Sequence, residues 1–252
     1  VWADVPFPEL DDNTGNPVTG PVFVEGAKSG KTLKVQILQI LPDERGILPV
    51  RSTIGVLRGV VPERTARVIK FTDNRVWISE RVSVPARPMI GTIGVAPKKE
   101  AVATAYPGSH GGNLDNNFAS VGAEIFFPVA CEGALIGLGD IHAAMGDGEL
   151  TCGGADICAD VLVRVEALDT PFTYLNPYVQ KDGLIATHGY GESYEAASEM
   201  ACREMRQLIS DKMHVSKYEA ILLMAARADL GLCQACRCHI PMIVRAAFPI
   251  LW

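Results

Sequence analysis

Two short polar stretches of the chain gather side chains that could bind a metal ion. HGGNLD contains His110 and Asp115, and GDIHAAMGDGE, further along the chain, contains Asp140 and His142. Any one of these side chains could belong to a solvated loop or a satisfied hydrogen bond, but together they place two of the five histidines in one polar region. Imidazole and carboxylate ligands suit Zn²⁺ or a related transition ion with an open position for water, whereas oxygen ligands suit Ca²⁺. These four residues are therefore the predicted metal ligands.

The same stretches supply the other groups that hydrolysis would need. A bound cation lowers the pKa of water toward neutrality and polarises a carbonyl group. Glu149 is the predicted general base, and Asp147 beside it is a second catalytic candidate. Glycine permits unusual turns and close approach to a ligand, so Gly111, Gly112 and Asn113 are predicted to position a substrate. Backbone N–H groups there could also stabilise a developing oxyanion.

The segment between the two stretches suggests how they could meet. Residues 123–138, AEIFFPVACEGALIGL, are predicted as a strand, a turn and a strand, and such a hairpin would bring its two ends together. In GDIH, Asp140 and His142 alternate with Ile141, so on a strand both polar side chains point to one side. The prediction is a single shared metal centre, and it requires the two stretches to be neighbours in the fold.

The wider sequence predicts an α+β fold that is predominantly β, with barrel- or sandwich-like hairpin sheets. Short β-type runs punctuated by Gly, Pro, Asn and Asp fill the first 180 residues. In LKVQILQI, Leu33, Val35 and Ile37 share one face, and DVLVRVEAL alternates in the same way. A chain of 252 residues can form one large domain or two closely packed ones, and residues 1–252 are predicted to form a single continuous domain. No repeat of fixed period is visible in the sequence.

Two helices are predicted in the C-terminal half. One covers residues 192–209, and a second begins at the capping box SKYE, residues 216–219. Both are expected to pack against the sheet through apolar stripes at helical spacing. The predicted stripes are Ala197, Ala201, Met205 and Leu208 in the first helix, and Ile221, Met224, Ala225 and Ala228 in the second.

Charge and hydropathy exclude two classes of partner. The net charge is −6, the isoelectric point is near 5.4, and no cluster of Lys and Arg offers a surface for a phosphate backbone. No apolar run approaches the roughly 20 residues that span a bilayer. The seven cysteines are odd in number, which fits a reducing compartment better than a disulfide framework and predicts a cytoplasmic protein.

Two motifs that suggest other chemistry have simpler explanations. EGAKSGKT, residues 25–32, ends like a phosphate-binding loop, but its first glycine is one residue too close and a strand follows it, so a turn is predicted. CQACRCH, residues 233–239, contains half of a zinc motif without a second half. On a strand, Cys236, Cys238 and Ile240 would share one face as small buried hydrophobic residues, opposite Arg237 and His239.

In addition to the polar cluster, a series of motifs resembles the acetamidase/formamidase family of amide hydrolases, in the same order along most of the chain. The motifs are TGPVFVEGA at 19–27, IGTIGVAP at 90–97, HGGNLD at 110–115, FFPV followed by GALIGLGDIHAAMGDGE, and ADLGLCQACRCHIPMIVRAAFP near the C-terminus. The resemblance implies a β-rich fold with flanking helices, a homodimer or higher homo-oligomer, and hydrolysis of a small amide to a carboxylate and ammonia.

The family motifs fall on the residues of the predicted centre. The resemblance places them at Gly111, Gly112, Asn113 and Asp115, at Asp140 and His142, and at Gly146, Asp147, Gly148 and Glu149. The chain departs from the family where Asp156 takes the place of a glutamate and Met145 that of a glutamine, and an upstream strand segment of the family is expected to be absent. Two alternatives remain: a lactam as the substrate, or a non-catalytic β protein in which the acids hold Ca²⁺.

Overall fold

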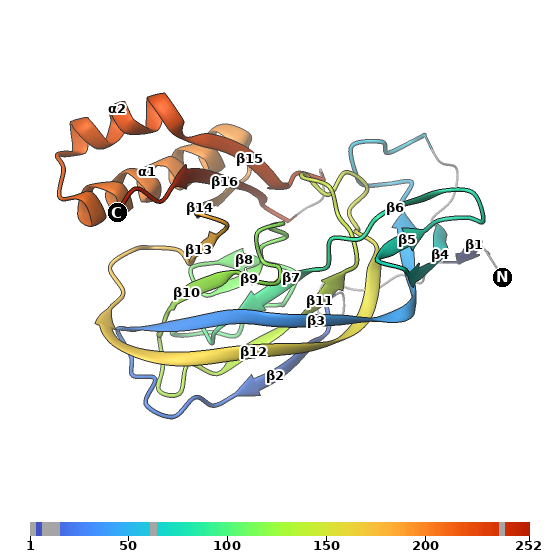
Figure 1. Cartoon of the computed structure of the whole chain (residues 1–252), viewed down its shortest axis with the longest axis horizontal. Coiled ribbons are helices and arrows are strands. Elements are labelled where there is room, and N and C mark those ends of the chain that lie inside the picture. The colour runs from blue at the N-terminus through green and yellow to red at the C-terminus, as the bar shows by residue number, and fades with distance from the viewer. Residues whose placement is uncertain (1–3, 7–15, 61–64, 237–239) are drawn as a thin grey trace.

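The computed structural model describes residues 4–6, 16–60, 65–236 and 240–252, and in these residues the fold is one large curved sheet with two helices (Figure 1). The sheet has 16 strands, and its main path runs β15-β16-β14-β13-β10-β3-β12-β11-β7-β9-β8. All pairs of these strands are antiparallel. The predicted class, mostly β with two helices in the C-terminal half, is confirmed.

The strands of the main path vary greatly in length. Their bounds are β3 Lys31–Val50, β7 Met89–Gly94, β8 Pro107–Gly108, β9 Gly111–Asn113, β10 Glu124–Pro128, β11 Ile136–His142, β12 Asp156–Pro171, β13 Tyr178–Lys181, β14 Leu184–Gly191, β15 Asp229–Gln234 and β16 Met242–Pro249. The two longest strands, β3 and β12, lie side by side and curve along the molecule as a half-barrel (Figure 1).

The alternating patterns of β3 and β12 explain how this sheet forms its core. Leu33, Val35 and Ile37 are fully buried, whereas the residues between them are partly exposed. Val163 of β12 is partly buried and packs against the main core, whereas its neighbour Leu162 is exposed. Because strand side chains alternate between faces, each strand turns one apolar face toward the core, as the sequence predicted.

Five further strands complete the sheet. They are β1 Asp4–Pro6, β2 Val18–Val22, β4 Thr65–Thr72, β5 Arg75–Trp77 and β6 Ser83–Pro85. β2 pairs with β11, whereas β4 pairs with the far end of β3 and continues into β5 and β6. The residues between β2 and β3 form a turn, which confirms the prediction for EGAKSGKT.

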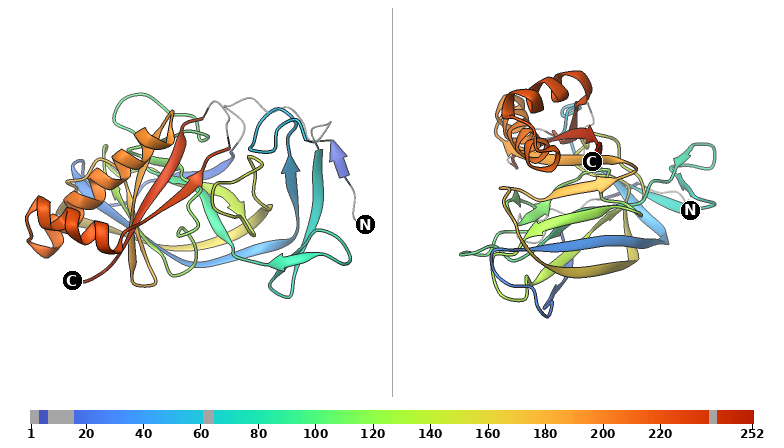
Figure 2. Two further views of the ribbon diagram at one scale, coloured as in Figure 1. Left: turned by 90° about the horizontal axis from the view of Figure 1, so that it is seen from above. Right: turned by 60° about the vertical axis from the view of Figure 1, so that its left-hand side comes forward.

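The helices α1 Tyr194–Met213 and α2 Lys217–Arg227 lie together at one end of the molecule, opposite β4 to β6 (Figure 2). α1 packs on β14 and β16 through its buried residues Ala197, Ala201, Met205 and Leu208, as predicted. Gly189 of β14 is required at this contact, because a Cβ atom there would collide with the backbone of α1 at Ala197.

The second helix begins as predicted, but the prediction of which residues face inward is partly wrong. Ser216 and Glu219 form the capping box. Ala220 is the fully buried residue of α2, whereas Ile221 is 49% exposed. α2 packs mainly against α1 and lies at the edge of the fold, so only a narrow part of its apolar surface is covered.

Strand β7 is the element that brings the two polar stretches together. It pairs with β9 on one side and with β11 on the other, so that Thr92 faces Asn113 across one ladder and Gly139 across the other. Residues 123–138 contain a strand, a turn and the start of a second strand, as predicted. The hairpin is wrong, because β10 pairs with β3 and β13 and not with β11. The two stretches are neighbours, as predicted, but a third strand places them there.

In the described part of the chain, neither helix is long and apolar enough to cross a bilayer.

Candidate metal centre

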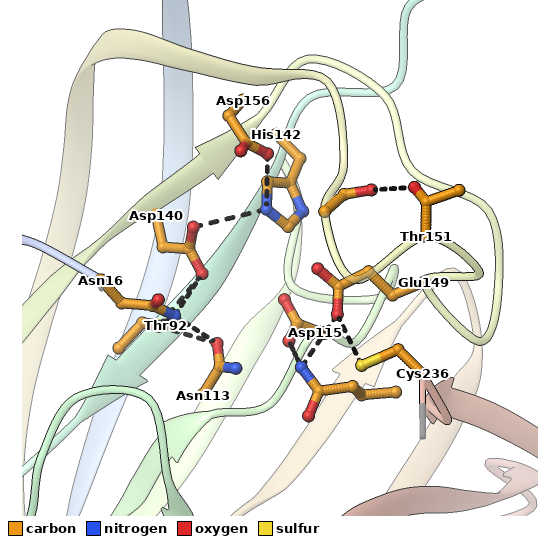
Figure 3. A network of polar contacts seen from close by, with 12 residues as sticks. Asn16, Thr92, Asn113, Asp115, Asp140, His142, Glu149, Thr151, Asp156 and Cys236 are labelled. Carbon is orange, nitrogen blue, oxygen red and sulfur yellow. Dashed lines mark hydrogen bonds and ion pairs between the residues drawn. The ribbon is translucent and has the colours of Figure 1, made fainter. Parts of the chain in front are cut away.

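Three predicted ligands converge at one end of β11. Asp140 and His142 belong to β11, and Asp115 follows β9 by two residues (Figure 3). One ligand atom from each of the three residues lies within 4.8 Å of the others. Asp115 and His142 are buried, and Asp140 is partly exposed. The group therefore has one open side.

A glycine on the central strand makes this convergence possible. A Cβ atom on Gly91 of β7 would lie 2.6 Å from Oδ2 of Asp140 and 2.8 Å from Oδ1 of Asp115. The backbone oxygen of Asp140 would also lie 2.8 Å from it. Both carboxylates thus occupy the space above Gly91 that any larger residue would fill.

Hydrogen bonds fix the orientation of Asp140. Asn16 Nδ2 donates to its Oδ2 at 2.9 Å, and the Thr92 hydroxyl lies 3.3 Å from the same oxygen. The other oxygen, Oδ1, lies 3.4 Å from Nε2 of His142. Outer groups of this kind orient metal ligands, because they occupy one carboxylate oxygen and leave the other to the ion.

Asp156, the first residue of β12, lies on the other side of His142. Its Oδ1 is 3.4 Å from Nε2 of His142. Burial raises the pKa of Asp156 to about 7, helped by the neighbouring carboxylate of Asp140. Burial lowers the pKa of His142, but Asp140 and Asp156 outweigh it, so this pKa is well above its usual value. The imidazole is thus surrounded by negative charge.

Glu149 approaches the group from the loop between β11 and β12. Burial raises its pKa above the usual value, while His142 and a hydrogen bond from Gln234 act in the opposite direction. The Nε2 atom of Gln234 donates to Oε2 of Glu149 at 2.8 Å and to Oδ2 of Asp115 at 2.7 Å. Burial, Glu149 and Asp140 together raise the pKa of Asp115 well above its usual value.

The composition and bonding of the group fit a divalent cation. Four carboxylates surround one imidazole, and Arg51 lowers the pKa of two of them, those of Glu149 and Asp156. Like charges crowded together in a buried space are unfavourable unless a cation balances them. Oδ1 of Asp115 and Nδ1 of His142 are also buried without a hydrogen-bond partner, which leaves them available as ligand atoms. Two carboxylates and an imidazole form a donor set suited to Zn²⁺ and related ions.

The backbone around the group is held in an uncommon conformation. Asp115, Asp140 and Glu149 have φ angles of 44°, 55° and 45°, in the left-handed region that favours glycine. Such residues cost of order 1 kcal/mol each and persist where the surrounding structure holds them for a function. Three acids of one cluster share this property, which supports a functional role for the cluster.

A cavity opens beside the group. Its volume is about 590 Å³, and Asp140 and Asp156 line it together with Arg45, Ile47 and other residues of β2, β3, β11 and β12. A small molecule could therefore reach these two carboxylates from outside.

Comparison with known proteins identifies the family. The model of the acetamidase/formamidase family matches residues 98–227, more than half of the chain and the part that contains Asp115, Asp140, His142 and Glu149. The chain belongs to the acetamidase/formamidase family. A Schizosaccharomyces pombe protein that carries a formamidase name is 24% identical over 212 residues, 60% of this chain and 51% of that protein. The chain therefore spans about half the length of this relative.

Two solved structures show the same fold. One is described as a recombinant predicted acetamidase/formamidase from Thermoanaerobacter tengcongensis, with a TM-score of 0.90 and 38% identity over 96% of this chain and 79% of that one. The other is an acetamidase from Bacillus halodurans, with a TM-score of 0.89 and 32% identity over 96% of this chain and 81% of that one.

The structure brings four of the predicted site residues together and places His110 elsewhere. Asp115, Asp140 and His142 come together, and Glu149 lies next to them. His110 does not belong to this group of ligand atoms. Its ring packs against Gly108 and Gly112 at the turn between β8 and β9, where burial lowers its pKa.

Asp147 lies in an ion pair. Its two oxygens receive hydrogen bonds from Arg245 at 3.0 and 2.5 Å, and Asn117 donates to it at 2.8 Å. Burial raises its pKa, but these hydrogen bonds outweigh the effect and lower it. The contacts fasten the loop that carries Glu149 to β16, which is a structural explanation for this acid.

The three predicted substrate-binding residues form the short strand β9. Gly111 and Gly112 pair with β7, where a Cβ atom on Gly111 would collide with Ile93 and one on Gly112 with Tyr106. The side-chain oxygen of Asn113 lies 2.9 Å from the Thr92 hydroxyl and accepts from Asn16 at 3.0 Å. Close strand packing accounts for both glycines, and their role in substrate binding stays a prediction.

Several residues of the centre were not found among the sequence candidates. Gly91 and Thr92 lie within the motif IGTIGVAP, which the resemblance had marked without assigning a role. Asn16 and Gln234 are remote from both polar stretches in the sequence. Gln234 lies within the C-terminal motif of the resemblance, which had assigned it no role, and no motif marks Asn16. Their positions depend on β2 and β15, so strand pairing alone reveals them.

The cysteine prediction needs one correction. Cys152 and Cys236 form a disulfide, so Cys236 is buried but not a free thiol. This bond runs against the expectation that the cysteines stay reduced. The described cysteines Cys131, Cys158, Cys202 and Cys233 are free. Arg237, Cys238 and His239 lie outside the described residues.

Proposed function

We propose that this chain hydrolyses a small linear amide of the formamide or acetamide type with the help of a divalent cation, Zn²⁺ in the first instance. The observation that carries the proposal is the convergence of Asp115, Asp140 and His142 within 4.8 Å, beside the buried Glu149. Membership of the acetamidase/formamidase family supports it.

Each group has a separate part in the proposed reaction. Asp115, Asp140 and His142 would hold the cation, which when bound would lower the pKa of water and polarise the amide carbonyl. Glu149, with its raised pKa, is suited to take a proton from the attacking water and return it to the leaving nitrogen. A C–O bond forms and the C–N bond breaks, which gives a carboxylate and ammonia.

The cavity beside the centre does not restrict the substrate to the smallest acyl groups. The cavity of about 590 Å³ beside Asp140 and Asp156 exceeds the needs of formamide, so a ring amide is a meaningful comparison substrate. We also propose, on the family resemblance alone, that the protein is a homodimer or higher homo-oligomer, and light scattering measures the oligomeric state directly. Cytoplasmic localisation was predicted from the odd number of cysteines and stays a prediction.

The experiment combines metal analysis with an ammonia-release assay. The purified protein is tested with formamide, acetamide and a five-membered lactam, before and after removal of metal by a chelator and after addition of Zn²⁺. We expect chelation to abolish turnover, Zn²⁺ to restore it, and the open-chain amides to be preferred. Full turnover by a demetallated sample would remove the cation from the mechanism.

Variants separate the metal ligands from the base. Asp140→Asn should lower the metal content, whereas Glu149→Gln should keep the metal and reduce kcat by about 10²–10⁴-fold, the usual range for a general base. Asp160→Asn, a change at an exposed carboxylate of β12, is the matched control and should alter neither. A protein that binds metal but releases no ammonia from any of these amides would support the non-catalytic, Ca²⁺-binding alternative instead.

A further inference from the structure

Gln234 connects two parts of the centre that the proposed reaction uses differently. Its single NH₂ group donates to Oδ2 of Asp115 at 2.7 Å and to Oε2 of Glu149 at 2.8 Å. Asp115 is a candidate metal ligand, and Glu149 is the candidate base. Both hydrogens of one nitrogen are used, so the distance between the two carboxylates depends on one side chain.

The orientation of this carboxamide is determined by its neighbours. With the nitrogen toward Asp115 and Glu149, two donors meet two carboxylates, whereas the reverse orientation would place a carbonyl oxygen against both. In the observed orientation Oε1 of Gln234 is buried without a hydrogen-bond partner, which carries an energetic cost. The favourable bonds to the two carboxylates outweigh this cost, since hydrogen bonds to charged groups are the stronger kind.

The backbone around Gln234 is fastened to the loop that carries Glu149. Gln234 ends β15, where it pairs with Ile243 of β16 and forms a bridge with Gly148. The N–H of Gly148 donates to the oxygen of Leu232 at 3.0 Å, and the N–H of Ala235 donates to the oxygen of Gly148 at 3.0 Å. The residue as a whole is only 4% exposed. Both the backbone and the side chain are therefore held in place.

We infer that Gln234 is a positioning residue that sets the separation and orientation of the metal ligand Asp115 and the base Glu149. The inference rests on the proposed function and adds a residue that lies beyond positions 98–227, the part matched by the family model. By occupying Oδ2 of Asp115, Gln234 leaves Oδ1, which is buried without a partner, for the cation. By holding Oε2 of Glu149, it keeps the carboxylate turned toward the centre.

Gln234→Met tests this role, because methionine has a similar length but cannot donate a hydrogen bond. At saturating metal we expect kcat to fall about 10–100-fold with KM nearly unchanged, because Glu149 loses its support while no substrate contact is removed. The affinity for Zn²⁺, measured by titration of the metal-free protein, should fall about 10–100-fold because Asp115 loses the hydrogen bond that orients it. Gln180→Met, in strand β13 away from the centre, is the matched control and should change neither quantity.

A double-mutant cycle on metal affinity provides a readout that does not depend on activity. In the Asp115→Asn background, Gln234→Met should weaken Zn²⁺ binding by much less than it does in the unaltered protein, since the contact it acts through has changed. Equal effects in the two backgrounds would overturn the inference. Gln234→Asn, which keeps the amide but is one methylene shorter, carries the same test if Gln234→Met does not fold.

The outcomes distinguish this inference from the proposed function. If the unaltered protein binds metal but releases no ammonia, the proposed function fails and the metal-affinity cycle still tests the link to Asp115. If the unaltered protein is active and Gln234→Met changes only the thermal midpoint, with kcat and Zn²⁺ affinity preserved, Gln234 is merely structural and the inference is refuted.

Discussion

Removal of the Cys152–Cys236 disulfide should lower the stability of the protein by a measurable amount. The bond joins residues separated by 84 positions, and its Cα atoms are 5.1 Å apart, within the usual range. In the chain-entropy model, a closed loop of this length contributes roughly 4–5 kcal/mol by restricting the unfolded chain. Measured values are commonly about 2–4 kcal/mol, so the expected loss lies in that range.

Chemical denaturation measures this loss. The double variant Cys152→Ala/Cys236→Ala should unfold at lower denaturant concentration, and a dithiol reductant should shift the unaltered protein in the same direction but leave the double variant in place. Cys202→Ala is the matched control, because Cys202 is partly buried and free. Its transition should still respond to the reductant.

Thiol titration of the denatured protein checks the chemistry directly. Reduction should release two additional thiols from the unaltered protein and none from the double variant. If the two thiols are released but the midpoint of unfolding does not move, the entropic argument is wrong. If reduction releases no thiols, the bond itself is absent.

Two further predictions concern the support of the centre and the acid stability of the fold. Gly91→Ala should weaken Zn²⁺ binding by at least about tenfold, because its Cβ would lie 2.6 Å from Asp140 and 2.8 Å from Asp115; Gly146→Ala, whose Cβ meets nothing within 4 Å, should bind normally in the same titration. His188 is fully buried, and burial lowers its pKa to about 4 in the folded protein. In the unfolded chain the same imidazole binds a proton once the pH falls below about 6.5, so acid favours the unfolded chain. Stability should therefore fall by about 2–3 kcal/mol between pH 7 and pH 4.5, and a His188→Gln variant with the same acid dependence in urea unfolding would refute this assignment.

The relation between sequence and structure is clearest in the helices and the long strands. The capping box at Ser216 and the buried spacing of α1 depend on residues a few positions apart, and both predictions are confirmed. The alternation of β3 and β12 is equally local. The inner face of α2 was predicted incorrectly, because it depends on how α1 and the sheet edge cover the helix.

The candidate centre shows the same division. The residue types in HGGNLD and GDIHAAMGDGE, with the resemblance they carry, were enough to nominate Asp115, Asp140, His142 and Glu149. They were not enough to separate His110 and Asp147 from that group, because a nearby position in sequence does not fix the direction of a side chain. The turn before β9 turns His110 toward Gly108, and Arg245 of β16 pairs with Asp147.

The sequence by itself determined the β-rich class, the two helices and the chemical types of the ligands, since these follow from local spacing and composition. It also indicated the family, through the motifs that carry the resemblance. The tertiary structure decided that β7 lies between the two polar stretches, that Gly91 leaves room for two carboxylates, and that Asn16 and Gln234 orient them. The physical reason is that strand order and register join residues more than a hundred positions apart, and no local pattern encodes those pairings.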